Sequence, residues 1–243
     1  MGDKEQMNAK KLLISGGNGK FAQSIVQQRG EHIVFAPPRK RMDITKIEDI
    51  EAAIDIYKPD IFLHAAAYTR PMKKHIDNPD LSIENNIMGT CNVVLGCMKN
   101  NIKLIYMSTD YVYPGVTGDY KEEDSLLPIN NYAWTKLGGE CAVHLYKNSL
   151  ILRACMTERP FVHKKALVDS KKSLIYIDEA AKICLKLLDK TGIINMGGEP
   201  TNSYEFVKHE RPDIEKIYRK DIQDVNMAED STMNLDKMKK HLQ

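Results

Sequence analysis

The feature that most constrains the fold is a glycine-rich turn between the first apolar segment and the first helix. Residues 11–15 (KLLIS) have the short apolar pattern of a buried strand, and the motif Gly16-x-x-Gly19-x-x-Ala22 follows at once. Glycines at such a turn let the backbone approach a pyrophosphate, and the next helix, predicted over 21–28, supplies amides and a positive dipole end. Its place at the start of a strand–helix–strand unit favours dinucleotide binding over an ordinary flexible turn. The residues expected to bind the cofactor here are Gly16, Gly17, Asn18, Gly19, Lys20 and Phe21.

Apolar strands alternate with helices along the chain, which is the order of a parallel sheet covered on both faces. We therefore expect an α/β fold, a Rossmann-type doubly wound parallel sheet with a small, shortened C-terminal lobe. Residues 1–153 are predicted to form the cofactor-binding domain and 154–243 the substrate-binding region, in which 174–196 return to the sheet. The predicted strands are 11–15, 31–36, 61–67, 103–108, 149–154 and 192–196. The predicted helices are 21–28, 46–57, 85–99, one that contains Tyr132, 178–190, and small terminal helices within 204–243.

The composition indicates a small ligand rather than a polymer or a membrane. The 35 basic and 33 acidic residues nearly balance, so no field of one sign favours nucleic acid or a membrane surface as a partner. Five scattered cysteines, without a Cys-x-x-Cys pair or a Cys/His cluster, indicate thiols in a reducing compartment and no metal site. The polar stretch Met1–Lys10 lacks the apolar core of a signal peptide, and no later run reaches membrane-spanning length. The chain is expected to be cytoplasmic.

The residues after the second predicted strand indicate which dinucleotide is bound. An acid at this point would bind the 2′-hydroxyl of NAD, but the chain has the bases Arg39, Lys40 and Arg41 instead. NADP(H) is therefore favoured over NAD(H), with solvated loop charges as the alternative. Asp43 is expected to face the adenine, and Ile44 beside it is assigned to the same cofactor site.

A tyrosine and a lysine lie four residues apart in the helix near the middle of the chain. Tyr132 and Lys136 are separated by one helical turn, so their side chains share one face. A lysine held there lowers the pKa of the phenol by charge proximity, which suits proton transfer during carbonyl reduction. Most such pairs lie on a solvated helix surface, so this pair indicates a catalytic role only together with the other motifs of the chain.

Four phrases in a fixed order carry a resemblance to a known family. They are the glycine motif, Ile61–Thr69 (IFLHAAAYT), Ser108–Tyr113 (STDYVY) and Asn131–Glu140 (NYAWTKLGGE). With them the chain resembles the extended short-chain dehydrogenase/reductase superfamily and, within it, the dTDP-4-dehydrorhamnose reductases. The resemblance implies NADPH-dependent reduction of the 4-keto group of a nucleotide-linked 4-keto-6-deoxy sugar, a step of deoxysugar biosynthesis. It is clear over 11–153 and resumes weakly at 175–188, 203–207 and 234–238.

The resemblance also implies roles for single residues. Thr109 would hydrogen-bond the substrate carbonyl, Tyr132 would deliver the proton, and Lys136 would bind the nicotinamide ribose and tune Tyr132. Thr109 ends a predicted parallel strand, where open α/β sheets bind their ligands. The small residues that would let the cofactor pass over a strand end are Ala65, Ala66 and Ala67.

The substrate side of the site is assigned in the same way. The residues expected to bind substrate are Thr69, Asn86, Asp110, Tyr111 and Arg153. For Asn86 the alternative is an exposed helix residue, and for Arg153 it is surface charge. His64 is expected to be a packed, hydrogen-bonded strand residue rather than a catalyst.

The chain departs from the family after Arg153. It lacks the tryptophan-containing strand end and the Asp-Gln-x-Gly-x-Pro-Thr-like phrase usual there, and the acidic residues that bind magnesium in some relatives have no match. Residues 154–173 are expected to be mobile without ligand and to order over the nucleotide sugar, because 158–172 are highly charged and lack clear periodicity. The sequence leaves the nucleotide, the sugar and the oligomeric state open, a homodimer included.

Two other functions stay open. One is a nucleotide-sugar epimerase or dehydratase of the same superfamily, which would retain NAD tightly. The other is a non-catalytic, NADP-binding regulatory subunit like that of methionine adenosyltransferase. The complete set of Thr109, Tyr132 and Lys136 argues against the second, and the short C-terminal lobe argues mildly for it.

Overall fold

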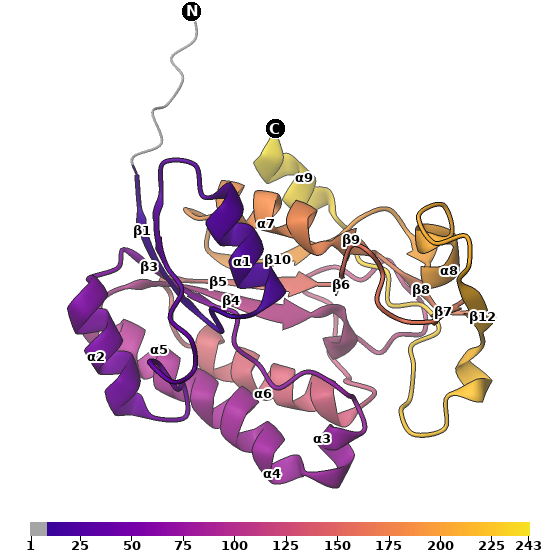
Figure 1. Cartoon of the computed structure of the whole chain (residues 1–243), viewed down its shortest axis with the longest axis horizontal. Helices are drawn as coiled ribbons and strands as arrows, with labels where there is room; N and C mark the ends of the chain where they lie inside the picture. The colour runs from indigo at the N-terminus through magenta and orange to yellow at the C-terminus, as the bar shows by residue number, and fades with distance from the viewer. Residues whose placement is uncertain (1–8) are drawn as a thin grey trace, which may run out of the picture.

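The computed structural model describes residues 9–243, which form a parallel sheet between two layers of helices (Figure 1). Residues 1–8, on which most of the prediction about a signal peptide rests, lie outside the described part. The six strands are ordered β10-β5-β4-β3-β1-β2, and every neighbouring pair is parallel. The strands are β1 (Lys11–Ser15), β2 (Ile33–Phe35), β3 (Ile61–His64), β4 (Lys103–Thr109), β5 (Ser149–Ala154) and β10 (Gly192–Met196). The predicted α/β fold is confirmed.

Helices cover both faces of this sheet, with α2, α5 and α6 on one face and α1, α7 and α9 on the other (Figure 1). The chain therefore needs strands that are apolar on both sides. In β4, Ile105 and Met107 face one core and Leu104 and Tyr106 the other, because side chains alternate along a strand. The covering helices are α1 (Lys20–Gln28), α2 (Ile47–Tyr57), α5 (Gly89–Asn100), α6 (Asn131–His144), α7 (Ile177–Lys186) and α9 (Asp236–Leu242).

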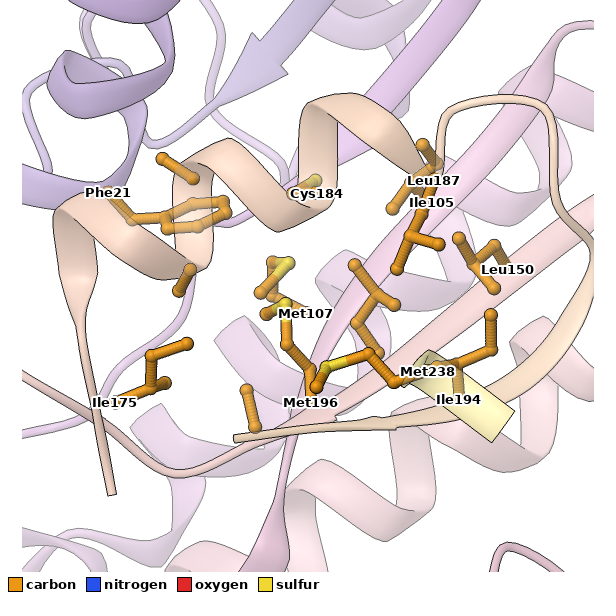
Figure 2. Packing of buried hydrophobic residues seen from close by; sticks show 14 of the residues in the cluster. Phe21, Ile105, Met107, Leu150, Ile175, Cys184, Leu187, Ile194, Met196 and Met238 are labelled. Carbon is orange, nitrogen blue, oxygen red and sulfur yellow. The ribbon is translucent and has the colours of Figure 1, made fainter. Parts of the chain in front are cut away.

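The core under α1 and α7 joins the two ends of the chain. Phe21 of α1 and Cys184 of α7 pack over Met107 and Met196 of the sheet, and Met238 of α9 reaches the same cluster (Figure 2). The C-terminal helix is thus part of the main core. Residues 177–196 return to the sheet, since α7 packs on α1 and β10 pairs with β5.

Several elements differ from the predicted ranges. The strand β3 ends at His64, because the next two amides bond the Ser15 hydroxyl instead of a neighbouring strand. The helix predicted over 85–99 begins as a π-helix, Ile83–Met88, and continues as α5. The short helices are α3 (Lys74–Asp77), α4 (Pro79–Ser82), α8 (Ser203–Val207) and the 3₁₀ turns Asp110–Val112 and Arg219–Asp221.

The C-terminal lobe consists of two-stranded ladders between distant segments. In residues 158–172, where the sequence has no clear periodicity, β7 pairs with β12 and β8 pairs with β11. A small separate cluster supports the lobe and contains Phe161, Ala166, Val207 and Ile214. The strands are β6 (Met156–Thr157), β7 (Lys165–Leu167), β8 (Lys171–Lys172), β9 (Ile175–Tyr176), β11 (Thr201–Asn202) and β12 (Glu215–Ile217). The predicted mobility of this segment stays a prediction.

Candidate active site

The order of the strands reverses at β1, and open α/β sheets bind their ligands at such a point, beyond the carboxyl ends of the two strands. We call the region beyond the ends of β1 and β3 the crevice. The glycine turn lies in this crevice. Gly16 has a φ of +74°, and a Cβ on it would lie 2.9 Å from the Ala66 Cα. A Cβ on Gly17 would lie 2.1 Å from the Ala36 carbonyl oxygen, so neither position accepts a side chain. The two glycines therefore let the segments that follow β2 and β3 pack directly against the turn.

The N-terminus of α1 faces the same crevice. The turn closes through a 2.7 Å hydrogen bond from the Gly19 amide to the Gly16 carbonyl. Among the described residues, no side chain caps this helix, which leaves its first amides available to an anion. Asn18 and Lys20 are exposed, whereas the Phe21 ring is packed in the core. A phosphate would therefore contact Phe21 through its backbone and not through its ring.

The small residues after β3 form the facing wall. Ala65, Ala66 and Ala67 are half-buried, and the amides of the first two donate to the Ser15 hydroxyl at 3.2 and 3.1 Å. These bonds hold the loop flat against the end of β1. The wall has no side chain larger than a methyl group at these three positions.

At the other end of the crevice, Arg39 is tied to Asp43. Its Nε donates to Asp43 Oδ2 at 3.0 Å, while the Thr45 amide and hydroxyl donate to Oδ1. Burial alone would raise the pKa of the Asp43 carboxyl, but these bonds from Thr45 and Arg39 lower it overall. Lys40 remains exposed. The Ile44 side chain is buried in the second core, against α5, and so lies away from the crevice.

The proposed catalytic residues come from β4 and α6. Thr109 ends β4 and is buried; its hydroxyl donates to Asp110 Oδ1 at 3.1 Å and accepts from the Tyr111 amide at 3.3 Å. Tyr132 lies in the first turn of α6, which Asn130 caps by accepting from the Ala133 amide at 3.0 Å. The cap fixes where the helix starts and hence where the phenol lies.

Lys136, one turn further along α6, is buried. Its Nζ lies 4.1 Å from the centroid of the Tyr106 ring, which gives the ammonium a cation–π partner. Burial lowers the pKa of the ammonium to about 7, although the nearby Glu140 carboxylate acts against this shift. Lys136 therefore exchanges its own proton near neutral pH.

The expectation that Lys136 lowers the pKa of the Tyr132 phenol is wrong for this arrangement. Burial raises the pKa of the Tyr132 phenol, and the charges of Asp110 and Tyr111 raise it further. Arg70 is the cation that mainly opposes them. A lysine whose own charge is depressed by burial is a weak source of positive field, which is the physical reason for the difference.

Asn86 lies inside the structure rather than on a helix surface. It is 1% exposed, so the alternative of an exposed helix residue is wrong. Its amide group donates to the Tyr68 carbonyl and the Thr135 hydroxyl, both at 2.9 Å, and accepts from the Tyr68 amide at 2.7 Å. Asn86 thus joins the loop after β3 to α6 and fixes both around the site. Thr69, next in this loop, is exposed.

His64 is a packed strand residue, as expected. Its ring bonds Ser15 Oγ at 2.7 Å and Thr90 Oγ1 at 3.0 Å, and Thr90 in turn donates to the Asn86 carbonyl. Burial lowers the pKa of the imidazole to about 3, so the ring is neutral. This chain of bonds connects the glycine turn to Asn86.

Arg153 requires a correction, because its side chain is only 2% exposed. It pairs with Glu140 of α6 at 2.9 Å and donates to the Tyr113 hydroxyl at 2.9 Å and the Glu122 carbonyl at 3.0 Å. It is therefore not surface charge. With all three guanidinium nitrogens bonded inside the protein, it joins β5 to α6 and is not available to a diphosphate.

Two features of the site were missed in the sequence. Asp110, predicted to bind substrate, is buried and pairs with Lys172 of the C-terminal lobe, 3.7 Å away. Glu158, just after β6, bonds both Lys20 of α1 and Arg70 across the crevice. Neither pairing has a local sequence signal, since the partners are 62 or more residues apart in the chain.

A cavity of about 170 Å³ opens beside Tyr132. Met72 and Ile76 form its apolar side, and the segment Gln223–Asn226 of the C-terminal region closes it. An ion pair between Lys73 and Asp224, 3.6 Å apart, holds this segment near α3. The cavity connects Tyr132 to the part of the chain in which a substrate lobe was predicted.

Residues 10–157 match the family model described as the RmlD substrate binding domain. The chain belongs to this family. The resemblance to the dTDP-4-dehydrorhamnose reductases is thereby confirmed, and the match ends close to Arg153, where the sequence departs from the family.

The relatives that the chain is similar to carry names of more than one kind. The dTDP-4-dehydrorhamnose reductase of Aggregatibacter actinomycetemcomitans is 31% identical over 156 residues, 60% of this chain and 51% of the relative. The methionine adenosyltransferase 2 subunit beta of Xenopus tropicalis is 25% identical over 210 residues, 74% of this chain and 63% of the relative. The chain thus spans between half and two thirds of the length of these relatives.

The fold extends further than the sequence likeness. The structure of dTDP-4-dehydrorhamnose reductase from Bacillus anthracis str. Ames in complex with NADP superimposes with a TM-score of 0.84 at 21% identity, covering 95% of this chain and 91% of that one. The C-terminal lobe therefore retains the family fold while its sequence diverges. Within residues 9–243, no helix is long and apolar enough to cross a membrane, and no three acidic, His or Cys side chains are grouped to hold a metal ion.

Proposed function

We propose that this chain is an NADPH-dependent reductase of the 4-keto group of a nucleotide-linked 4-keto-6-deoxy sugar. The observation that carries the proposal is the common edge of the sheet at which the glycine crevice, Thr109 and the first turn of α6 all lie. A reductase needs a cofactor site and a proton donor at one such edge. The family membership supports the same activity.

NADPH would lie in the crevice between β1 and β3. The amides at the start of α1 suit its pyrophosphate, and the small side chains of the alanines after β3 would let it pass. Arg39 and Lys40 suit a 2′-phosphate, and Lys136 would bind the nicotinamide ribose. When bound, the cofactor supplies the hydride.

The side chains would then act on the sugar carbonyl. Thr109 would turn its hydroxyl proton from Asp110 Oδ1 to the carbonyl oxygen as negative charge develops there. Tyr132 would transfer its proton to that oxygen. The raised pKa of Tyr132 keeps the phenol protonated at neutral pH, as an acid must be. Asn86 would act by positioning the loop that carries Thr69. We assign the half-buried Tyr111 to the wall of the substrate site. The predicted contact of Asp110 with substrate is not supported, because its buried carboxylate is bonded to Thr109, Ser231 and Lys172.

The test is NADPH oxidation against a panel of dTDP-, UDP- and GDP-linked 4-keto-6-deoxy sugars. We expect turnover with at least one sugar, a slower rate with NADH, and loss of turnover in Tyr132→Phe. Absence of oxidation with every sugar, by a protein that binds NADPH, would contradict the proposal. Tightly retained NAD without net oxidation of added NADPH would instead favour an epimerase or dehydratase.

A second candidate is a regulatory subunit of a methionine adenosyltransferase. One observation favours it: the likeness to the Xenopus tropicalis subunit covers more of this chain than the likeness to the bacterial reductase, 74% against 60%. NADP binding without turnover, together with stoichiometric binding to an adenosyltransferase in size-exclusion chromatography, would support it.

Three expectations stay predictions: the cytoplasmic location, the homodimer and the domain division at residue 153. Light scattering on the same size-exclusion column tests the homodimer.

A further inference from the structure

A buried histidine lies between the loop after β3 and the first turn of α6. His75 belongs to α3 and is 1% exposed. Its Nε2 lies 3.3 Å from the Thr69 carbonyl, which can only accept, so this nitrogen carries a proton and donates it. Its Nδ1 lies 2.8 Å from Ser82 Oγ and accepts from that hydroxyl when the ring is neutral. Burial lowers the pKa of the imidazole, which favours this neutral form.

The anchored imidazole packs against the ring of Tyr132. The centroids of the His75 and Tyr132 rings are 5.2 Å apart, and their planes are tilted by 58°. The Tyr68 ring also meets the imidazole, at 65° and with the centroids 5.1 Å apart. Aromatic pairs attract one another at such separations and tilts. A series of three rings therefore joins the loop after β3 to the proposed proton donor.

Two further features make the place of the Tyr132 ring depend on His75. The Asn131 side-chain amide donates to the His75 carbonyl at 3.1 Å, one residue before Tyr132. A second cavity, of about 240 Å³, is bordered by His75, Ser82 and Trp134, whereas Tyr132 borders the first cavity. Loss of the imidazole would open space next to the Tyr132 ring, in which the phenol would lose its fixed orientation.

We propose that His75 is a positioning residue of the candidate site, whose ring holds the Tyr132 phenol in the orientation from which it donates its proton. This role rests on the proposed function of Tyr132 and names the side chain that places it. A displacement of about 1 Å at a reacting group can cost roughly a hundredfold in rate. A histidine that only filled the core would affect stability, but not the turnover of the folded protein.

The experiment compares two variants at position 75. His75→Leu removes the ring, and His75→Phe keeps a ring without its nitrogens. With the best nucleotide sugar, kcat should fall about ten- to a hundredfold in His75→Leu and no more than about threefold in His75→Phe. The dissociation constant of NADPH should not change in either variant, because the contact is with Tyr132. Wild-type kcat in His75→Leu, or an equal loss in both variants, would overturn the inference.

A double-variant cycle tests whether His75 acts through Tyr132. In Tyr132→Phe the donated proton is absent, so adding His75→Leu should lower the remaining single-turnover rate by no more than about threefold. A larger further loss would show that His75 acts on the site by another route and would contradict the inference. The matched control is His32→Leu, at a buried histidine before β2 whose Nδ1 accepts from the Lys10 amide. This control should retain the wild-type kcat.

Trp134 shows whether the region around His75 stays folded. It is the single tryptophan of the chain and borders the same cavity as His75, so its fluorescence reports on this region. If His75→Leu does not fold, His75→Asn replaces it, because it retains a donor and an acceptor but no ring. The kcat of His75→Asn should fall as far as expected for His75→Leu, and a wild-type value would overturn the inference.

A second measurement does not depend on turnover. The ring-proton NMR signals of Tyr132 and His75 are identified by their loss in Tyr132→Phe and His75→Phe. A nuclear Overhauser effect between the two rings is expected in the wild type, and its absence would overturn the inference. If the rings are in contact but no sugar is reduced, the proposed function fails and the placement of Tyr132 by His75 stands. If a sugar is reduced and His75→Leu keeps its kcat, only the inference about His75 fails.

Discussion

Tyr132 is the residue on which the proposed chemistry depends most directly. Its phenol lies in the first turn of α6, half-buried, with its ring 5.2 Å from that of His75. Tyr132→Phe keeps the ring and removes the proton donor. We expect turnover to fall by about 10²- to 10⁴-fold, the usual contribution of positioned acid–base catalysis, with NADPH affinity unchanged.

The measurement for Tyr132→Phe is steady-state kinetics with a fluorescence titration of NADPH. Tyr146→Phe is the control, because its hydroxyl bonds the carbonyls of Cys97 and Ile102 at the opposite edge of the sheet. The control should retain wild-type turnover. Near wild-type turnover in Tyr132→Phe would remove the catalytic assignment and strengthen the regulatory alternative.

Arg39 and Lys40 are expected to select the phosphorylated cofactor. Both are exposed next to the crevice, and charged hydrogen bonds to a phosphate contribute on the order of 1.5 to 3 kcal/mol. The double variant Arg39→Ala/Lys40→Ala should therefore bind NADPH roughly ten- to a hundredfold more weakly. NADH affinity should stay constant, as should both affinities in Arg29→Ala, a control on the far end of α1. Calorimetric titration of both cofactors measures this, and equal wild-type affinities for the two would refute the assignment.

At the scale of elements, Glu158 links the start of α1 to the loop after β3. Its carboxylate bonds Lys20 and lies 3.2 Å from Arg70 Nη1, so it places a negative charge beside the expected pyrophosphate site. Glu158→Gln should tighten NADPH binding a few-fold at low ionic strength, and the gain should shrink in high salt because partly exposed charges are screened. Asp213→Asn, at an exposed pair with Arg211, is the control. Weaker binding in Glu158→Gln would mean that the carboxylate supports the crevice instead of repelling phosphate.

The Glu140–Arg153 pair holds α6 against β5. The two side chains are 4% and 2% exposed, so removing one partner leaves a buried charge. Arg153→Met should lower the free energy of unfolding by about 3–5 kcal/mol, the usual effect of breaking a buried pair. The double variant Arg153→Met/Glu140→Gln should recover part of this loss. Urea unfolding measures both, and a loss below 1 kcal/mol in Arg153→Met would show that the pair is not the main link.

Sequence patterns predicted elements where local chemistry decides them. The glycines of the first turn and the apolar run of β1 define a strand–turn–helix unit on their own, and the observed α1 differs from the prediction by one residue. The helix that contains Asn86 shows what local sequence patterns do not predict. Its periodicity predicted a helix, but it does not predict the π-turn or the bonds from Asn86 to Tyr68 and Thr135, whose partners are distant in the chain.

At the scale of the whole molecule, the sequence fails where long-range pairing decides burial. Arg153 and Lys172 are charged residues that sequence reasoning placed at a ligand or left unassigned, and both are buried only because Glu140 and Asp110 meet them in the folded chain. The lobe is built from strands of two or three residues, too short for any periodicity. The positions of the glycine turn, Thr109 and Tyr132 were predictable because each lies at the end of a main strand or the start of a main helix.

The burial of Lys136 should also make the free energy of unfolding of the whole protein depend on pH. Its pKa is lowered to about 7 in the folded protein from 10.5, so between these values the unfolded chain binds more protons. The free energy of unfolding therefore rises with pH from about 7 to 10.5 through this group. Lys136→Met removes this contribution, so the variant should be more stable than the wild type at pH 6. Its free energy of unfolding should rise less than that of the wild type between pH 6 and pH 9.

The measurement is urea unfolding of wild type and Lys136→Met at pH 6 and pH 9, with NADPH titration of the same samples. Lys147→Met, an exposed lysine just after the same helix, should reproduce the wild-type pH dependence. We expect Lys136→Met to bind NADPH more weakly although its fold is more stable, because the ammonium that destabilises the core is the group proposed to bind the ribose. Identical pH dependence in wild type and Lys136→Met would contradict the buried, depressed lysine, and unchanged NADPH affinity would contradict its role in binding.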